Sequence, residues 1–404
     1  MRSVSEIWKS RHIHLLFLAY FLVAVIASVQ GLIHGPKQFT PGGPFYHEYN
    51  NYAIFKQSSF HLSEGKNLYQ PYPEEYWDLY KYSPSFALFF SVFSFLPDWL
   101  GLTLWCLLNS LMLFAAINRL PGIVDEKRSW ILLFCLIELL GSLQNAQSNA
   151  LMAALIILAF AFLEDANYIM ATFCIVFSCY IKIFGAVGFA LFLMYPGKRK
   201  MIAYGIIWFL VLGLLPALLT GFNGLIQSYK EWFRLLGEDR EGSQGLSLSG
   251  ILESWFHIEM PRSLITLAGI LVFCIPLTRV KMYRFLEFRV LMLASVLLWI
   301  IAFNHKAESP TFIISVAGMA IWYFLKERNR RDTILLWMGF ILTTLSVSDL
   351  CPRPIREHIV IPFGIKGIMT VVIWIKVIQE LIKMNYWKQL DYGMNTGEYP
   401  WTNR

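Results

Sequence analysis

The stretch at residues 47–84, HEYNNYAIFKQSSFHLSEGKNLYQPYPEEYWDLYKYSP, lies between a first apolar segment and a series of further ones. It cannot lie in hydrocarbon, because each charged side chain would cost roughly 2.5–3.5 kcal/mol there. These side chains are Glu48, Lys56, Glu64, Lys66, Glu74, Glu75, Asp78 and Lys81. Tyr52, Phe55, Ser59 and Leu62 follow helical spacing, and Gly65 stands where a helix would stop. The pattern predicts an ordered, partly helical loop held against a membrane bundle; a plain exposed connector is the alternative.

The composition of the whole chain supports a membrane protein. Of the 404 residues, 56% are hydrophobic and 15% are charged, whereas soluble domains carry about 25% charged residues. The net charge of +7 resides in basic residues that cluster in short loops, which is how membrane topology is set. The basic character therefore indicates orientation, and a nucleic-acid partner is not expected.

The cysteines and the N-terminal segment argue against a disulfide-bonded protein, a thiolate metal site and a cleaved signal peptide. The six cysteines form no CxxC pair, and most lie in apolar runs, where cysteine behaves as a small hydrophobe. We expect no disulfide framework and no thiolate metal site. The first apolar segment, residues 14–33, follows basic residues but has no small-residue cleavage site, so it predicts a retained transmembrane helix.

The apolar runs predict an all-α, polytopic transmembrane helix bundle with about 12 crossings. We expect one integral-membrane domain over residues 1–383, with ordered external loops at 34–81 and 221–262 that carry short juxtamembrane helices, and a polar cytoplasmic tail at 384–404. Several runs are shorter than the ~20 residues that a perpendicular span needs. Such helices require shielding by protein or a polar cavity that enters the membrane.

The positive-inside rule orients the bundle. The cytoplasmic loops are expected to be those with Arg2, Lys9 and Arg11, with Lys198-Arg199-Lys200, with Arg279, Lys281 and Arg284, and with Lys326, Arg328, Arg330 and Arg331. Residues 34–81, 221–262, 304–310 and 348–358 are then external. Residues 83–118 fit either a re-entrant half-helix at 84–96 followed by a span at 99–118, or a helical pair that puts 119–128 outside.

Polar residues between apolar runs are functional candidates, because each must be satisfied or it destabilises the fold. The densest set is Gln144, Asn145, Gln147 and Asn149. Four amides bring many donors and acceptors to one place, as hydroxyl-rich ligands such as sugars require; a hydrogen-bonded helix turn is the alternative.

Other polar groups are isolated in the sequence. Lys182 stands between two short apolar runs with no nearby carboxylate, which fits either a snorkelling lysine or the counter-charge to a lipid phosphate. Glu138 lies within an apolar run and is expected to pair with a base on another helix, or to function. At the outer end of a helix, His305, Lys306 and Glu308 suit phosphate or hydroxyl binding, or form an ordinary charged loop.

In their order and sidedness, several motifs resemble glycosyltransferase family 87, a group of polyprenol-phosphate-sugar-dependent membrane enzymes in the C superfamily. The motifs are Ser59, Gly65 and Leu68-Tyr69 in the first loop, Tyr82 and Pro84 after it, Gln147 and Asn149, Ile181-Lys182, and Leu246-Ser247-Leu248 with Gly250. The resemblance covers roughly residues 10–325. It implies transfer of a mannose-like hexose or a pentose from a polyprenyl-phosphate donor to a lipid-linked or envelope glycan acceptor on the external leaflet.

The resemblance also implies site residues. The family's catalytic carboxylate, usually Asp, falls on Asn51 here, and an amide cannot accept a proton. Glu48, three residues earlier and on the same face of a helix, is the best substitute. The other acidic residues of the loop remain candidates: Glu64, Glu74, Glu75 and Asp78. Lys182, with Lys306 or His305, would neutralise the departing phosphate.

The remaining expected site residues are the four amides together with Ser247 and Glu308. The expected partners are the donor, a glycan or glycolipid acceptor and membrane lipids, with no cofactor and no metal. The expected location is the bacterial cytoplasmic membrane, with the active site on its external face. The alternatives are a transporter or flippase with a Glu138–Lys182 pair, and a catalytically inactive member of the same fold.

Overall fold

The computed structural model describes residues 4–238, 245–257, 260–304 and 307–387, and the side chains from residue 12 onward. This part of the chain is almost entirely helical. The α-helices and the short ribbon are α1 (Val4–Ile33), β1 (Lys37–Gln38), β2 (Phe45–Tyr46), α2 (Asn50–Ser63), α3 (Pro84–Ser94), α4 (Asp98–Asn118), α5 (Asp125–Gln144), α6 (Asn149–Glu164), α7 (Tyr168–Ile181), α8 (Lys198–Leu214), α9 (Ala217–Glu238), α10 (Leu248–Phe256), α11 (Arg262–Leu277), α12 (Leu286–Ala302), α13 (Ile313–Phe324), α14 (Arg330–Gly339), α15 (Arg353–Ile355) and α16 (Ile365–Lys383). The 3-10 segments are η1 (Ile183–Met194), η2 (Val280–Arg284) and η3 (Ser309–Phe312), and the π segments are η4 (Phe340–Leu345) and η5 (Arg356–Val360).

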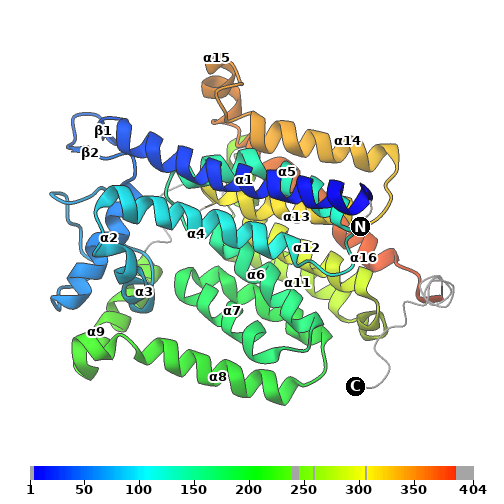
Figure 1. Ribbon diagram of the computed structural model, residues 1–404, viewed down its shortest axis with the longest axis horizontal. Coiled ribbons are helices and arrows are strands. Elements are labelled where there is room, and N and C mark those ends of the chain that lie inside the picture. Colours follow the sequence, from blue (N-terminus) through cyan, green and yellow to red (C-terminus); the bar gives the residue numbers. More distant parts are fainter. Residues whose placement is uncertain (1–3, 239–244, 258–259, 305–306, 388–404) are drawn as a thin grey trace.

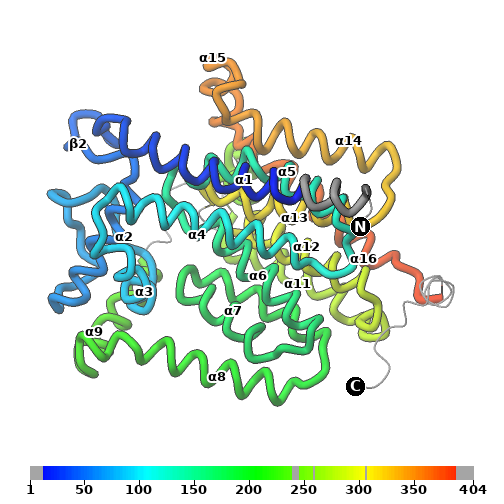
Figure 2. The backbone as a smooth tube through the Cα atoms, in the orientation of Figure 1, coloured from blue at the N-terminus to red at the C-terminus, as the bar shows by residue number. Residues whose placement is uncertain are grey.

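The helices form an elongated bundle with two distinct ends (Figure 1). The first residues of α1, α8 and α14 lie at the right of the view, and we call this the basic end because basic residues precede or begin these helices. The β1–β2 ribbon, α2, α3 and α9 lie at the left, which we call the loop end. Figure 2 shows α1 and α4 running side by side along the bundle in opposite directions.

Fewer helices are long and apolar enough to cross a membrane than the sequence predicts. Within the described residues, His12–Ile33 and Asp98–Asn118 are each long and apolar enough to span a membrane. Two bent pairs, α8 with α9 at 97° and α15–η5 with α16 at 61°, raise the count to at most four. The expected figure of about 12 crossings is therefore not confirmed. The remaining apolar helices are 10–17 residues long, and helices such as α6 and α13 are buried along most of their length, so protein shields them as anticipated.

The first polar loop is ordered, as the sequence predicts. Its helix α2 spans Asn50–Ser63, and Gly65 follows with a φ of +67°, a backbone conformation that glycine adopts at no steric cost. A short helix, α3, then begins at Pro84, and the Ser83 hydroxyl accepts a hydrogen bond from the Phe86 N–H as its cap. The two helices α3 and α4 match the expected segments 84–96 and 99–118, and both the re-entrant half-helix and the helical pair contain such a division. The break at Pro97-Asp98 divides them.

Aromatic packing fixes α2 and α3 on the bundle. The ring of Phe55 lies within 4.8–5.9 Å, between centroids, of the rings of Tyr82, Phe86, Phe90 and Trp105. All five side chains are buried. Edge-to-face pairs at these separations contribute about 0.5–1.5 kcal/mol each beyond their buried area, so the loop is part of the folded core.

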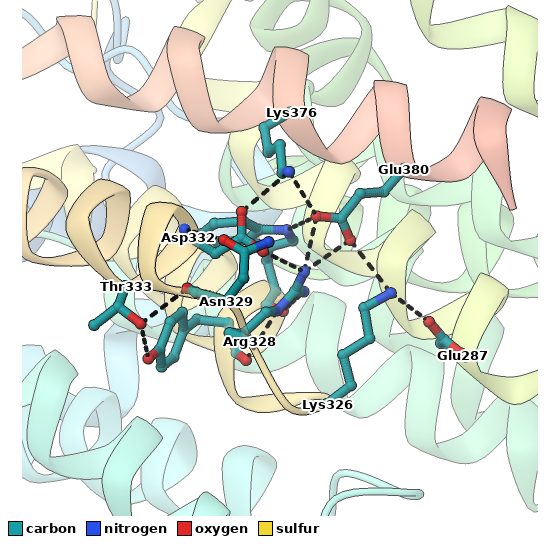
Figure 3. Close-up of polar contacts among 10 residues, drawn as sticks. Glu287, Lys326, Arg328, Asn329, Asp332, Thr333, Lys376 and Glu380 are labelled. Carbon is teal, nitrogen blue, oxygen red and sulfur yellow. Dashed lines mark hydrogen bonds and ion pairs between the residues drawn. The ribbon is translucent and has the colours of Figure 1, made fainter.

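A network of charges joins three helices near the basic end (Figure 3). Arg328 Nη1 lies 2.8 Å from both carboxylate oxygens of Glu380 on α16, and Lys376 Nζ lies 3.0 Å from Asp332 Oδ1 on α14. Lys326 bridges Glu380, at 3.5 Å, and Glu287 of α12, at 2.6 Å. Every acidic group in this set has a cationic partner, which a partly buried charge requires.

A second buried ion pair lies within the bundle. Glu138 of α5 and Lys366 of α16 are 4% and 2% exposed, and their Oε1 and Nζ atoms lie 2.7 Å apart. The expectation that Glu138 pairs with a base on another helix is confirmed. Its partner is Lys366, however, so the Glu138–Lys182 pair of the transporter alternative does not form.

Candidate active site at the loop end

The amide turn, residues 144–149, connects the end of α5 to the start of α6. Ala146 adopts a φ of +49°, which allows the chain to reverse between the two helices. The indole N–H of Trp105 donates to the Ala146 carbonyl at 2.8 Å, and Asn109 Oδ1 accepts from the Leu151 N–H at 3.1 Å. Both side chains come from α4 and are fully buried. The turn is therefore held by buried hydrogen bonds, which a low-dielectric interior strengthens.

Lys182 lies at a break between α7 and η1. Its backbone is extended, with φ −142° and ψ 127°, so the apolar run changes direction there. Its Nζ donates to Asn149 Oδ1 at 2.7 Å and to Gln147 Oε1 at 3.0 Å. Within the described residues no carboxylate oxygen lies within 4.0 Å of this Nζ. The hydrogen bonds of this ammonium group in the described part of the chain are thus to neutral amide oxygens.

Glu308 joins the same cluster from the segment before η3. Gln147 Nε2 donates to Glu308 Oε2 at 3.0 Å, while Asn149 Nδ2 donates to Gln147 Oε1 at 3.1 Å. We call these four residues the Lys182 cluster: Gln147, Asn149, Lys182 and Glu308. The carboxylate is exposed and the amides are buried, so the cluster runs from the protein interior to the surface.

The second loop reaches this cluster through the backbone. The Leu246 N–H donates to the Ala307 carbonyl at 2.8 Å, directly before Glu308. Ser247 follows, is 1% exposed, and its Oγ lies 2.9 Å from Ser249 Oγ at the start of α10. Ser247 therefore lies in the segment that contacts the cluster. Its hydroxyl, however, is hydrogen-bonded to Ser249 and to no member of the cluster in the described part of the chain.

The remaining expected amides face other elements. Asn51 Nδ2 of α2 donates to the Asn145 carbonyl at 2.9 Å, which ties the first loop to the amide turn. Gln144 Nε2 donates to Gln30 Oε1 of α1 at 2.9 Å, and Asn145 Nδ2 donates back to Gly141 at 2.9 Å. Gln144 and Asn145 thus secure helix packing around the turn.

Glu48 pairs with basic residues of the first loop and forms no described hydrogen bond to the Lys182 cluster. Its carboxylate accepts from His34 Nδ1 at 2.7 Å and from Lys37 Nζ at 3.3 Å, beside the β1–β2 ribbon. Partial burial raises the pKa of Glu48, but the hydrogen bonds and charges of His34 and Lys37 outweigh that effect, and the net result is a lowered pKa.

Most other acidic residues of the first loop also have a lysine or histidine partner. Glu64 pairs with Lys66, Glu75 with His61 and Asp78 with Lys81, at 2.7–3.1 Å. Glu74 is exposed. His305 and Lys306 lie outside the described residues. No group of three or more His, Cys, Asp or Glu side chains arranged to hold a metal ion occurs in the described part of the chain.

A bundle of apolar helices with a polar cluster at one end is the architecture of an integral membrane protein. The model of glycosyltransferase family 87 matches residues 80–348, which is more than half of the chain. The chain belongs to glycosyltransferase family 87, and it is therefore a membrane glycosyltransferase. A search of curated proteins gave no match.

The family match separates the expected site residues into two groups. The Lys182 cluster and Ser247 lie within residues 80–348, whereas Glu48 and Asn51 precede them. The sequence did not indicate Trp105 or Asn109, which hold the amide turn. An indole and an amide within an apolar span are the signals that could have identified them.

Proposed function

We propose that the protein transfers a mannose-like hexose or a pentose from a polyprenyl-phosphate donor to a lipid-linked or envelope glycan acceptor. The reaction would occur at the loop end, on the external face of a bacterial cytoplasmic membrane. The observation that carries this proposal is the contact of Lys182 with two amide oxygens and with no described carboxylate.

The donor phosphate would bind beside Lys182. A lysine that already has a carboxylate partner would have to exchange that partner for the phosphate, whereas the described hydrogen-bond acceptors of Lys182 are neutral. Its charge therefore remains available to a polyprenyl phosphate, whose negative charge increases as the sugar leaves. The preorganised lysine would stabilise the leaving phosphate, so the proposed reaction does not require a metal ion.

The sugar would bind among the amides and rings around Lys182. Gln147 and Asn149 each carry a donor NH₂ group and an acceptor oxygen, the pair of functions that a sugar hydroxyl also has. The rings of Tyr82 and Phe184 lie 5.6 and 5.8 Å from the lysine Nζ. Such rings provide an apolar wall for the lipid and a stacking face for the sugar.

The sidedness follows from the charges at the opposite end. Lys198, Arg199 and Lys200 begin α8 at the basic end, and the positive-inside rule assigns that end to the cytoplasm. The loop end, with the Lys182 cluster, would then face outward, where a nucleotide sugar is not available. A lipid-linked donor fits that side.

The acceptor hydroxyl requires a base. The sequence predicts Glu48 for this role with Asn51 beside it, and Glu308 competes with it because Glu308 belongs to the Lys182 cluster.

The test is a transfer assay with the purified protein in liposomes. Radiolabelled polyprenyl-phosphate mannose and polyprenyl-phosphate arabinose are supplied separately, with a lipid extract as acceptor, and labelled glycan is measured. We expect transfer from at least one lipid donor and none from the matching nucleotide sugars. Transfer from a nucleotide sugar alone, or no transfer from either lipid donor, would overturn the proposal.

A further inference from the structure

We propose that Glu308 is the general base that removes the proton from the acceptor hydroxyl. The inference rests on the proposed transfer from a lipid-phosphate donor and assigns the residue that activates the acceptor.

Gln147 lies between Lys182 and Glu308 in the Lys182 cluster. The amide of Gln147 accepts from Lys182 Nζ at 3.0 Å and donates to Glu308 Oε2 at 3.0 Å. A cation and a carboxylate are therefore separated by one side-chain amide. A sugar that binds at Gln147 would therefore have its phosphate near Lys182 and the acceptor hydroxyl near Glu308.

The Glu308 carboxylate forms no ion pair within 4.0 Å in the described part of the chain. Its partner there is the neutral amide of Gln147. Glu48, in contrast, is bonded to His34 and Lys37, and its lowered pKa makes it a weaker proton acceptor. Glu64 and Asp78 each pair with a lysine, and Glu75 lies 2.9 Å from His61 Nε2. Glu74 makes no hydrogen bond to any member of the Lys182 cluster among the described side chains.

The backbone on both sides of Glu308 is held by hydrogen bonds. The Glu308 carbonyl accepts from the Thr311 N–H at 3.0 Å and from Thr311 Oγ1 at 2.5 Å, at the start of η3. Ala307, before it, is 1% exposed and bonds to Leu246 of the second loop. The backbone is thus anchored on both sides while the carboxylate remains exposed. A fixed backbone with an accessible carboxylate suits a group that must meet a second substrate from outside.

The reaction step follows from these positions. The acceptor O–H gives its proton to a Glu308 oxygen as the acceptor oxygen forms a bond to the anomeric carbon. The bond between that carbon and the phosphate oxygen breaks, and its electron pair remains on the polyprenyl phosphate beside Lys182. The products are the glycosylated acceptor, polyprenyl phosphate and protonated Glu308, which releases its proton to water.

The proposal also accounts for the amide at position 51. Asn51 holds the first loop to the amide turn through the Asn145 carbonyl. With the base supplied by the segment before η3, position 51 need not carry a carboxylate.

The test compares Glu308→Gln with Glu48→Gln in the liposome assay. We expect Glu308→Gln to lower transfer by about 10²–10⁴-fold, the usual contribution of a positioned base, and Glu48→Gln to lower it less than about tenfold. Donor binding, followed by tryptophan fluorescence, should change little in either variant.

Azide supplies a readout that a structural role would not change. Azide attacks without losing a proton, so it does not need a base. We expect Glu308→Gln to form glycosyl azide from the lipid donor at the wild-type rate, whereas Lys182→Met should not. Glu308→Asp, which keeps the acid, serves if the amide variant does not fold, and it should retain more transfer activity than Glu308→Ala.

The outcomes distinguish the two proposals. If the wild-type protein transfers no sugar from a lipid donor, the proposed function fails. If the wild type is active and Glu308→Gln retains full activity, or if Glu48→Gln shows the larger loss, only the assignment of Glu308 fails. A folded Glu308→Gln protein that binds donor but forms no glycosyl azide would also overturn that assignment, because its defect would not be one of proton transfer.

Discussion

Asn51 on α2 donates its side-chain amide to the backbone carbonyl of Asn145, with 2.9 Å between Nδ2 and O. This bond connects two segments that are 94 residues apart in the chain. It joins the first loop to the amide turn. Gln147 and Asn149 of that turn accept hydrogen bonds from Lys182. The neutral residue at position 51 therefore has a structural role beside the candidate active site.

The Asn51–Asn145 bond predicts the effect of Asn51→Asp. A carboxylate cannot donate, so an oxygen would face the Asn145 carbonyl oxygen. We expect the free energy of unfolding to fall by about 1–2 kcal/mol, with no gain in transfer. Thermal unfolding in detergent and the liposome assay measure the two effects. Asn51→Ala is the control, because it removes the bond without adding repulsion, and a rise in transfer above wild type in Asn51→Asp would instead identify position 51 as a site for the base.

Lys182→Met should remove the phosphate contact while the protein remains folded. Its amide partners are neutral, so the substitution leaves no buried charge unpaired. We expect transfer to fall by about 10²–10³-fold, the usual loss for one preorganised group in a charge-stabilising site. The matched control is Lys198→Met at the basic end, whose Nζ donates to the Phe192 carbonyl at 2.6 Å. Equal losses in the two variants would contradict a specific role for Lys182.

Local signals in the sequence identified the first loop and its neighbours correctly. Helical spacing from Tyr52 to Leu62 and the stop at Gly65 match α2 and the residues that end it. The break at Pro97-Asp98 correctly predicted where one helix ends and the next begins. These features depend on residues within a few turns of one another, and sequence patterns record such relationships directly.

Relationships between distant residues were not predictable from the sequence. Glu138 and Lys366 are 228 residues apart, and Gln147 and Glu308 are 161 residues apart. The hydrophobic pattern shows that a buried charged group needs an ion-pair or hydrogen-bond partner. It does not show which residue is that partner. The expected number of crossings was not confirmed for a related reason, because a short apolar segment has the same composition whether it spans a membrane or packs inside a bundle.

Accessibility to a membrane-impermeant thiol reagent tests the orientation. Cysteines replace the exposed residues Lys66 and Asn223 at the loop end and Arg199 and Arg330 at the basic end, in a background with Cys274→Ser and Cys351→Ser. The other four native cysteines are buried. We expect labelling of intact cells at positions 66 and 223 alone. Labelling at position 199 or 330 without permeabilisation would contradict the assigned orientation and the external site.

The Glu138–Lys366 pair predicts a large loss of stability when one partner is removed. Lys366→Met would leave a carboxylate that is 4% exposed without its cation, which costs about 3–5 kcal/mol in the free energy of unfolding. The double variant Glu138→Leu/Lys366→Met should recover most of that loss, because two apolar groups need no partner. Arg234→Met is the control. Its partner Glu238 is 63% exposed and the arginine 70% exposed, so the change should stay below about 1 kcal/mol.

Thermal unfolding in detergent, measured for all three variants together, checks the Glu138–Lys366 prediction. The double variant should also keep transfer activity, because neither residue hydrogen-bonds to a member of the Lys182 cluster in the described part of the chain. Wild-type stability in Lys366→Met would contradict the ion pair. It would mean that Glu138 is held as a neutral acid, which needs no cation in a buried site. A stable double variant without transfer activity would assign the pair to the reaction, and the structural role argued from its burial would fail.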